Sequence, residues 1–283
     1  VKTNRKRVDL MDKRPIGIFD SGLGGLSVVK DFIKILPYEN IVYFGDTGRV
    51  PYGTKSRDTI LKYARQDEQF LLENDVKMVI AACGTVSSVA YDTGKDLSVP
   101  FLGVVEPSAK TAVSLTKNKR VGVIGTPTTV SSNSYKKAIN AIDESIEVFQ
   151  VGCPLFVSIV EQGWIDKDDE VAFLTAKRYL QPLIEADVDT LILGCTHFPL
   201  ISQTIAKVMG ENVTLISSGA ATALEAAELL KAQNLLNEKN DNPTQKYFVS
   251  DSPESFKKTA EIFLGGKIKG SVEQIQIENY GKE

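Results

Sequence analysis

Three cysteines and a single histidine are the side chains of this 283-residue chain best suited to act as nucleophiles, bases or metal ligands. Cys83 lies in the stretch "AACGTVSS" and Cys195 in "LGCTHFPL", where His197 follows two positions later. Each of these cysteines ends an apolar run typical of a buried strand and is followed by residues that suit the start of a helix. We therefore expect both thiols at strand-to-helix junctions.

An internal repeat gives Cys83 and Cys195 equivalent positions. The segment "ENDVKMVIAAC" (73–83) aligns without gaps to "EADVDTLILGC" (185–195). Two earlier segments repeat in the same order: "PIGIFDS" (15–21) matches "RVGVIGT" (120–126), and "IVYF" (41–44) matches "IEVF" (146–149). Three matches in one order indicate two similar halves. Cys153 has no counterpart in the repeat, so we interpret it as a structural residue.

Two equivalent thiols suit a reaction that inverts a carbon centre. A free thiol has a pKa of about 8.5, and the unpaired N–H groups at a helix start lower the pKa of a cysteine to roughly 3.5–7.5. One thiolate could then take a proton from one face of a carbon while the opposite thiol returns one to the other face. The alternative is that each cysteine is a small buried apolar side chain, which is common for free cysteine.

Other chemistries fit the spacing less well. Structural zinc sites draw their ligands from closely spaced pairs, whereas the three cysteines are 70 and 42 residues apart. The chain has no G-x-S-x-G elbow for a serine hydrolase and no C-x-x-C redox motif. The stretch "DSGLGGLS" (20–27) lacks the lysine of a phosphate loop, so its glycines indicate a tight turn that presents Asp20 and Ser21 to a small ligand. We expect no metal and no cofactor.

The elements that must position these residues alternate between strands and helices. Short apolar runs predict strands at 16–20, 41–45, 76–82, 101–105, 121–125, 146–151, 188–194, 213–217 and 246–250. Amphipathic segments predict helices at 56–73, 167–186 and 219–235, and Ser252 and Pro253 mark the start of the last helix. The alternation predicts an α/β fold with largely parallel sheets and active residues at the carboxyl ends of strands. Together with the repeat, it predicts two similar, pseudo-symmetric αβα domains with the active site in the cleft between them.

Composition excludes several classes of partner. Lys and Arg total 33 against 36 for Asp and Glu, a formal net charge of −3, so no basic field favours nucleic acid. No apolar run is long enough to cross a membrane. An odd number of widely separated cysteines suits reduced thiols, so we expect a cytoplasmic protein. The basic residues near the start, from Lys2 to Arg14, are interpreted as a solvated extension.

Four blocks of the sequence resemble those of the bacterial glutamate racemases, in the aspartate/glutamate racemase family. They are "IGIFDSGLGGLSV" (16–28), "GDTGRVPYG" (45–53), "CGT" (83–85) and "GCTHFPL" (194–200), and the resemblance runs from about residue 15 to 265. It implies a cofactor-independent enzyme that interconverts L- and D-glutamate for peptidoglycan synthesis.

The resemblance also implies roles for individual residues. Cys83 and Cys195 would be the two acid/base residues, and Asp20, Glu161 and His197 would be auxiliary polar groups. Contacts to glutamate would come from Asp20, Ser21, Tyr52, Gly53, Gly84, Thr85, Thr196 and His197. One departure stands out, because the family usually has an asparagine where this chain has Gly84. That change removes the donors and acceptor of an amide.

The remaining expectations concern organisation and competing functions. We expect one domain from 14–106 plus 218–283, carrying Cys83, a second domain from 107–217, carrying Cys195, and an N-terminal extension at 1–13. We also expect a homodimer. The competing enzyme is a two-cysteine racemase acting on aspartate or a hydantoin, against which the Cys-Thr-His block argues. From a different class, a non-catalytic two-lobed binding protein would have no need of matched thiols.

Overall fold

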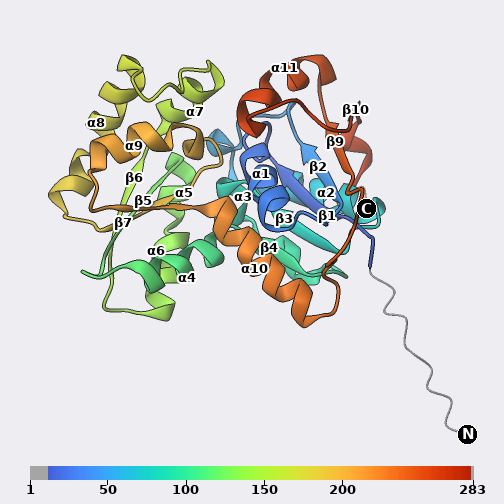
Figure 1. Cartoon of the computed structure of the whole chain (residues 1–283), viewed down its shortest axis with the longest axis horizontal. Coiled ribbons are helices and arrows are strands. Elements are labelled where there is room, and N and C mark those ends of the chain that lie inside the picture. The colour runs from blue at the N-terminus through green and yellow to red at the C-terminus, as the bar shows by residue number, and fades with distance from the viewer. Residues whose placement is uncertain (1–11, 282–283) are drawn as a thin grey trace, which may run out of the picture.

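Two parallel sheets form the centre of the protein, and the computed structural model describes residues 12–281. The first sheet has six strands in the order β10-β9-β2-β1-β3-β4, and the second has four in the order β6-β5-β7-β8. Figure 1 presents the two sheets side by side, each with helices packed around it. The bounds of the strands are β1 (Ile16–Asp20), β2 (Ile41–Gly45), β3 (Met78–Ala81), β4 (Phe101–Gly103), β5 (Arg120–Gly125), β6 (Glu147–Gly152), β7 (Thr190–Leu193), β8 (Thr214–Ser217), β9 (Gln245–Val249) and β10 (Ser271–Gln274).

Both faces of each sheet are covered by helices. In β1, Ile16 and Ile18 pack with helices α1, α10 and α11, whereas Phe19 packs with α2 on the opposite face. The second sheet lies between α7, α8 and α9 on one side and α4 and α6 on the other. The bounds of the helices are α1 (Leu26–Ile35), α2 (Arg57–Glu73), α3 (Gly84–Val89), α4 (Val105–Leu115), α5 (Pro127–Ser132), α6 (Ser134–Ile142), α7 (Pro154–Glu161), α8 (Glu170–Glu185), α9 (Ser202–Met209), α10 (Ser218–Ala232) and α11 (Pro253–Leu264).

The internal repeat appears as matching strand order. Strands β2-β1-β3-β4 of the first sheet have the same order along the chain and the same order in the sheet as β6-β5-β7-β8 of the second. The backbone follows the repeat closely, since the Ala82 N–H donates to the Phe19 carbonyl at 2.9 Å and the equivalent Gly194 N–H donates to the Ile124 carbonyl at 2.8 Å. The predicted α/β class with parallel sheets is confirmed.

The predicted strands are all present, with ends that shift by up to two residues. The predicted helices begin and end close to α2, α8 and α10, and the Ser252 hydroxyl caps α11 by accepting from the Ser255 N–H at 3.3 Å. Strand β10 was not expected, because its sequence "SVEQ" is short and largely exposed at the sheet edge and so has no apolar run.

Helix α10 runs between the two lobes, where it contacts α1 beside the first sheet and α4 beside the second (Figure 1). Residues 233–244, which follow α10, form no helix or strand before β9. No helix within residues 12–281 combines the length and apolarity that crossing a membrane requires. The expected N-terminal extension lies, up to residue 11, outside the described residues.

Candidate active site

A cavity of about 230 Å³ opens where the carboxyl ends of the two sheets face each other. Cys83 follows β3 of the first sheet, and Cys195 follows β7 of the second, and both line this cavity. All of the residues expected to act in the site line it except Asp20. These residues are Ser21, Tyr52, Gly53, Cys83, Gly84, Thr85, Glu161, Cys195, Thr196 and His197.

Asp20 lies behind this cavity rather than in its wall. Its side chain, at the end of β1, is 1% exposed and accepts the Gly22 N–H at 3.0 Å. Burial raises the pKa of the Asp20 carboxyl, although nearby His197 and backbone N–H groups act in the opposite direction. Asp20 is therefore a buried carboxyl group that acts electrostatically on Cys83 and His197.

The surroundings of Cys83 favour the neutral thiol. Cys83 is the N-cap residue of α3, as the sequence predicts, and its Sγ lies 3.6 Å from the Ser21 hydroxyl. Burial and the neighbouring Asp20 nevertheless raise the pKa of Cys83 to about 12. The Val86 N–H at the start of α3 does lower the pKa of Cys83, as expected, but removing the thiolate from water outweighs it. The expected net lowering is therefore wrong.

Cys195 has a different environment. It lies two residues before the N-cap residue of a short 3₁₀ helix (Phe198–Ile201), so the expected helix start directly after Cys195 is also wrong. Its Sγ is 3.8 Å from His197 Nδ1, and His197 Nε2 is 3.1 Å from Glu161 Oε1 on α7. Burial lowers the pKa of His197, but hydrogen bonds to Cys195 and Glu161 outweigh it and raise that pKa to about 10. His197 is thus a cation that separates Cys195 from the acidic Glu161.

Gly84 lies at a close approach of the two cysteine-bearing loops. A Cβ atom added at Gly84 would collide with the carbonyl oxygen of Gly194, the residue before Cys195. A side chain at this position therefore requires the two cysteine-bearing loops to move apart. This contact gives a physical reason for glycine where the resembling family usually has asparagine.

Several residues of the cavity wall were not singled out from the sequence. They include Thr126 and Pro127 at the start of α5, and Val157 and Ser158 on α7. The repeat held a signal for Thr126, because it aligns with Ser21. Its Oγ1 lies 3.2 Å from Thr85 Oγ1, much as Ser21 lies against Cys83. No comparable signal marks the residues of α7, because α7 lies outside the three repeated segments of the sequence.

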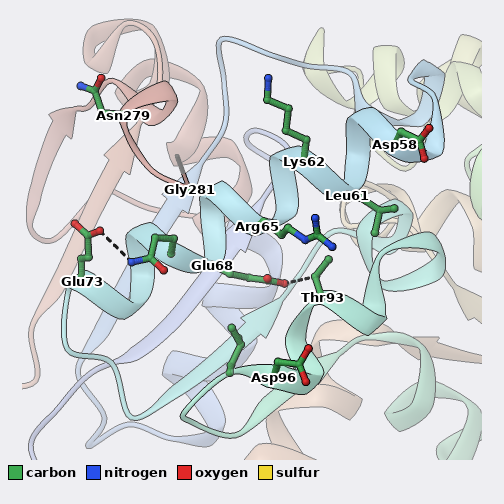
Figure 2. A pocket seen from close by; sticks show the side chains of 12 residues that line it. Asp58, Leu61, Lys62, Arg65, Glu68, Glu73, Thr93, Asp96, Asn279 and Gly281 are labelled. Carbon is green, nitrogen blue, oxygen red and sulfur yellow. Dashed lines mark hydrogen bonds between the residues drawn. The ribbon is translucent and has the colours of Figure 1, made fainter. Parts of the chain in front are cut away.

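Neither the remaining cysteine nor a second, wider groove forms part of this cavity wall. Cys153 is fully buried in the main hydrophobic cluster. A second groove, about 930 Å³, is lined by α2, the 3₁₀ segment Tyr91–Asp96 and residues near the C-terminus (Figure 2). Its lining includes no cysteine or histidine, so the smaller cavity is the candidate active site. Within residues 12–281, no group of three or more His, Cys, Asp and Glu side chains is arranged to hold a metal ion.

Comparison with known proteins agrees with the geometry. A family model described as Asp/Glu/Hydantoin racemase matches residues 45–226. A glutamate racemase from Geobacter metallireducens is 48% identical over 269 residues, which is 95% of this chain and 98% of the relative. The crystal structure of glutamate racemase from Francisella tularensis in complex with D-glutamate has a TM-score of 0.87 at 39% identity, covering 95% of this chain and 100% of that one. The Thermus thermophilus glutamate racemase structure, in complex with beta-chloro-D-alanine, has a TM-score of 0.85 at 41% identity, covering 95% and 99%.

Proposed function

Because this chain belongs to the Asp/Glu/Hydantoin racemase family, we propose that it interconverts L- and D-glutamate without a cofactor, using Cys83 and Cys195 as the two acid/base residues. The observation that carries this proposal is the placement of both thiols, at equivalent strand ends of the two halves, on one cavity. A non-catalytic binding protein has no need of this matched pair. Most of the chain is also covered by relatives named glutamate racemase.

The reaction is a balanced exchange of one proton for another. The thiolate of one cysteine takes the α-proton of glutamate and becomes a thiol. The opposite thiol gives its proton to the other face of the α-carbon and becomes a thiolate, so the configuration inverts and the two cysteines exchange protonation states. The reverse reaction begins from that second state.

The two thiols differ in the free protein. The protonated imidazole of His197, 3.8 Å from Cys195 Sγ, stabilises negative charge on that sulfur. The raised pKa of Cys83, to about 12, keeps Cys83 as the thiol. We therefore infer that Cys83 is the resting acid, and that the neighbouring His197 gives Cys195 a different environment.

The substrate is held by groups around both thiols. We propose that the backbone N–H groups near Ser21 and Gly84 donate to the carboxylates of glutamate, and that the hydroxyls of Thr85 and Thr196 donate to the carboxylates or accept from the amino group. Glutamate is favoured over aspartate and hydantoins because the Cys-Thr-His block of residues 195–197 resembles the glutamate enzymes. An assay on all three substrates tests this choice, and turnover of aspartate without turnover of glutamate would contradict it.

The test of the mechanism is racemisation in deuterium oxide. We expect glutamate to gain deuterium at the α-carbon as it racemises, and Cys83→Ser and Cys195→Ser each to lower kcat by at least about 10²-fold, a typical contribution of a general acid or base. The matched control is Cys153→Ser, which alters a buried thiol outside the cavity and should preserve deuterium incorporation. An unchanged rate in either Cys83→Ser or Cys195→Ser would refute the two-base mechanism.

We further propose a cytoplasmic homodimer that supplies D-glutamate to peptidoglycan. The three cysteines are free, as suits a reducing compartment. The second lobe exposes Leu155, Trp164 and Leu174 around α7 and α8, an apolar surface that a second subunit could cover. Sedimentation analysis tests the dimer, and growth of a D-glutamate-requiring bacterium that expresses this chain tests the cellular role.

A further inference from the structure

A buried group of polar side chains supports Tyr52 from behind the cavity. The Tyr52 hydroxyl donates to Asp46 Oδ2 and also lies 3.1 Å from Asp67 Oδ2 in the middle of α2. Arg49 completes the group, with Nε 2.6 Å from Asp46 Oδ2 and Nη2 3.2 Å from Asp67 Oδ1. Both aspartates are completely buried, and the Arg49 side chain is only 11% exposed. We call these four residues the Tyr52 network.

Counting hydrogens in the network leaves one contact unexplained if both carboxyls are ionised. The Tyr52 hydroxyl has one hydrogen, which it donates to Asp46. Asp67 Oδ2 then needs a hydrogen of its own to form a bond with the Tyr52 oxygen. A proton on Asp67 supplies it, and it completes a chain from Asp67 through Tyr52 to Asp46.

Counting charges leads to the same protonation state. Two buried carboxylates and one guanidinium would leave a net negative charge out of water, which is strongly unfavourable. When ionised, Glu68 adds negative potential beside Asp67, although burial raises the pKa of Glu68 itself to about 7. Glu68 accepts the Thr93 hydroxyl at 2.5 Å (Figure 2). With one proton on Asp67, the network contains a single Arg49–Asp46 ion pair and is neutral.

The distances distinguish the two carboxyls. Arg49 Nε lies 2.6 Å from Asp46 Oδ2, whereas Arg49 Nη2 lies 3.2 Å from Asp67 Oδ1, so the guanidinium pairs more closely with Asp46. Asp46 also accepts the Ser250 hydroxyl at 2.7 Å, so it has three donors around it. Burial and the Asp46 charge raise the pKa of Asp67 well above its usual range, in agreement with this geometry.

We propose that Asp67 holds a proton at neutral pH, and that the hydrogen-bond chain Asp67–Tyr52–Asp46, closed by Arg49, positions the 50–54 loop for substrate. This inference rests on the proposed function of the cavity. Tyr52 and Gly53 line that cavity, and the Gly53 carbonyl accepts the Thr128 hydroxyl of α5 at 2.6 Å. The loop is therefore held by the network on one side and by the opposite lobe on the other. Asp46, Arg49 and Asp67 act as positioning residues.

The decisive variants are Asp67→Asn and Asp46→Asn. An asparagine at 67 can donate to the Tyr52 oxygen and accept from Arg49, which reproduces a protonated carboxyl, so we expect kcat/KM for glutamate within about threefold of wild type. An asparagine at 46 leaves Arg49 without a counter-charge, and we expect kcat/KM to fall about tenfold to a hundredfold, the range for loss of a charged hydrogen bond. The loss should lie mainly in KM, because the loop holds substrate and does not transfer protons.

Two further measurements separate positioning from general damage. Asp67→Ala removes the donor that Asp67→Asn keeps, so it should raise KM by about the same factor as Asp46→Asn. Infrared difference spectroscopy at neutral pH should detect the carbonyl band of a protonated carboxyl in wild type, and this band should be missing in Asp67→Asn. Equal losses in Asp67→Asn and Asp46→Asn, or no carboxyl band assignable to Asp67, would overturn the proposal.

The spectroscopic measurement needs no turnover, so it remains valid if glutamate is not the substrate. Absence of the band in a wild-type protein that racemises glutamate refutes this inference and leaves the proposed function standing. Presence of the band in a protein that does not racemise glutamate refutes the proposed function and leaves the protonation of Asp67 standing.

Discussion

At the scale of single residues, the site depends on how closely two loops approach. Gly84 contacts the carbonyl of Gly194, and we expect Gly84→Ala to lower the free energy of unfolding by about 1–3 kcal/mol through overpacking. It should also lower kcat/KM for glutamate, because relieving the collision moves Cys83 away from Cys195. Chemical unfolding and steady-state kinetics test both effects. Gly266→Ala is the control, since its Cβ would meet nothing within 4 Å, and similar behaviour of the two variants would contradict this account.

The sequence predicted the two thiols well and their environments poorly. Cys83 and Cys195 could be identified because a repeat and short motifs lie within a few residues of each of them. Asp67 could not, because it lies in the polar run "RQDEQF" of α2, which is typical of a solvated helix face. Its burial depends on packing against residues 46–52, and no local pattern encodes that contact. The raised pKa of Cys83 was missed for the same reason, since burial is a property of the assembled lobes.

At the scale of elements, helix caps have two kinds of role. Thr126 caps α5 by accepting the Thr129 N–H at 3.2 Å, and Ser252 caps α11 at 3.3 Å. Replacing either by alanine should lower the free energy of unfolding by about 1 kcal/mol. Only Thr126 also lines the cavity and contacts Thr85, so only Thr126→Ala should lower kcat/KM as well. Unfolding curves and steady-state kinetics of Thr126→Ala and Ser252→Ala test this. Equal losses of kcat/KM would show that the cap, and not the contact of Thr126 with Thr85, determines activity.

Strands and long helices were predictable because their signals are local. Buried parallel strands are nearly continuous apolar runs, and α2, α8 and α10 are long enough for a helical period to be visible. Short elements carry too few residues for a period, as with β10, whose four residues pair with β9 at an exposed edge. The start of the helix after Cys195 was misplaced because Thr196 and His197 form a turn before the 3₁₀ helix begins.

At the scale of the whole molecule, the residues of the candidate active site and a stabilising ion pair lie at opposite ends of the first sheet. Cys83 and the Tyr52 network lie at the carboxyl ends of its strands. At the amino ends, Lys77 Nζ lies 2.6 Å from Glu39 Oε2, and both side chains are at most 1% exposed. Lys77 also donates to the Asp12 and Leu235 carbonyls, and Glu39 accepts from Asn237. This cluster joins the start of the sheet to the segment that returns from α10.

The last prediction concerns the contribution of the Lys77–Glu39 ion pair to the free energy of unfolding. Glu39→Gln leaves the Lys77 ammonium buried without a counter-charge, so we expect the free energy of unfolding to fall by about 3–5 kcal/mol. Lys77→Met should have a similar effect, and the double variant Glu39→Gln/Lys77→Met should lose less than the sum of the two. Urea unfolding measures all three, and KM for glutamate should stay unchanged in the folded protein because the cluster is at the far end of the sheet.

The exposed Lys95–Asp92 pair is the control, since Asp92→Asn breaks a pair that solvent screens and should leave the unfolding midpoint unchanged. Additive losses in the double variant would mean that Lys77 and Glu39 act separately, and the ion pair would then not be what joins the start of the sheet to the segment that follows α10.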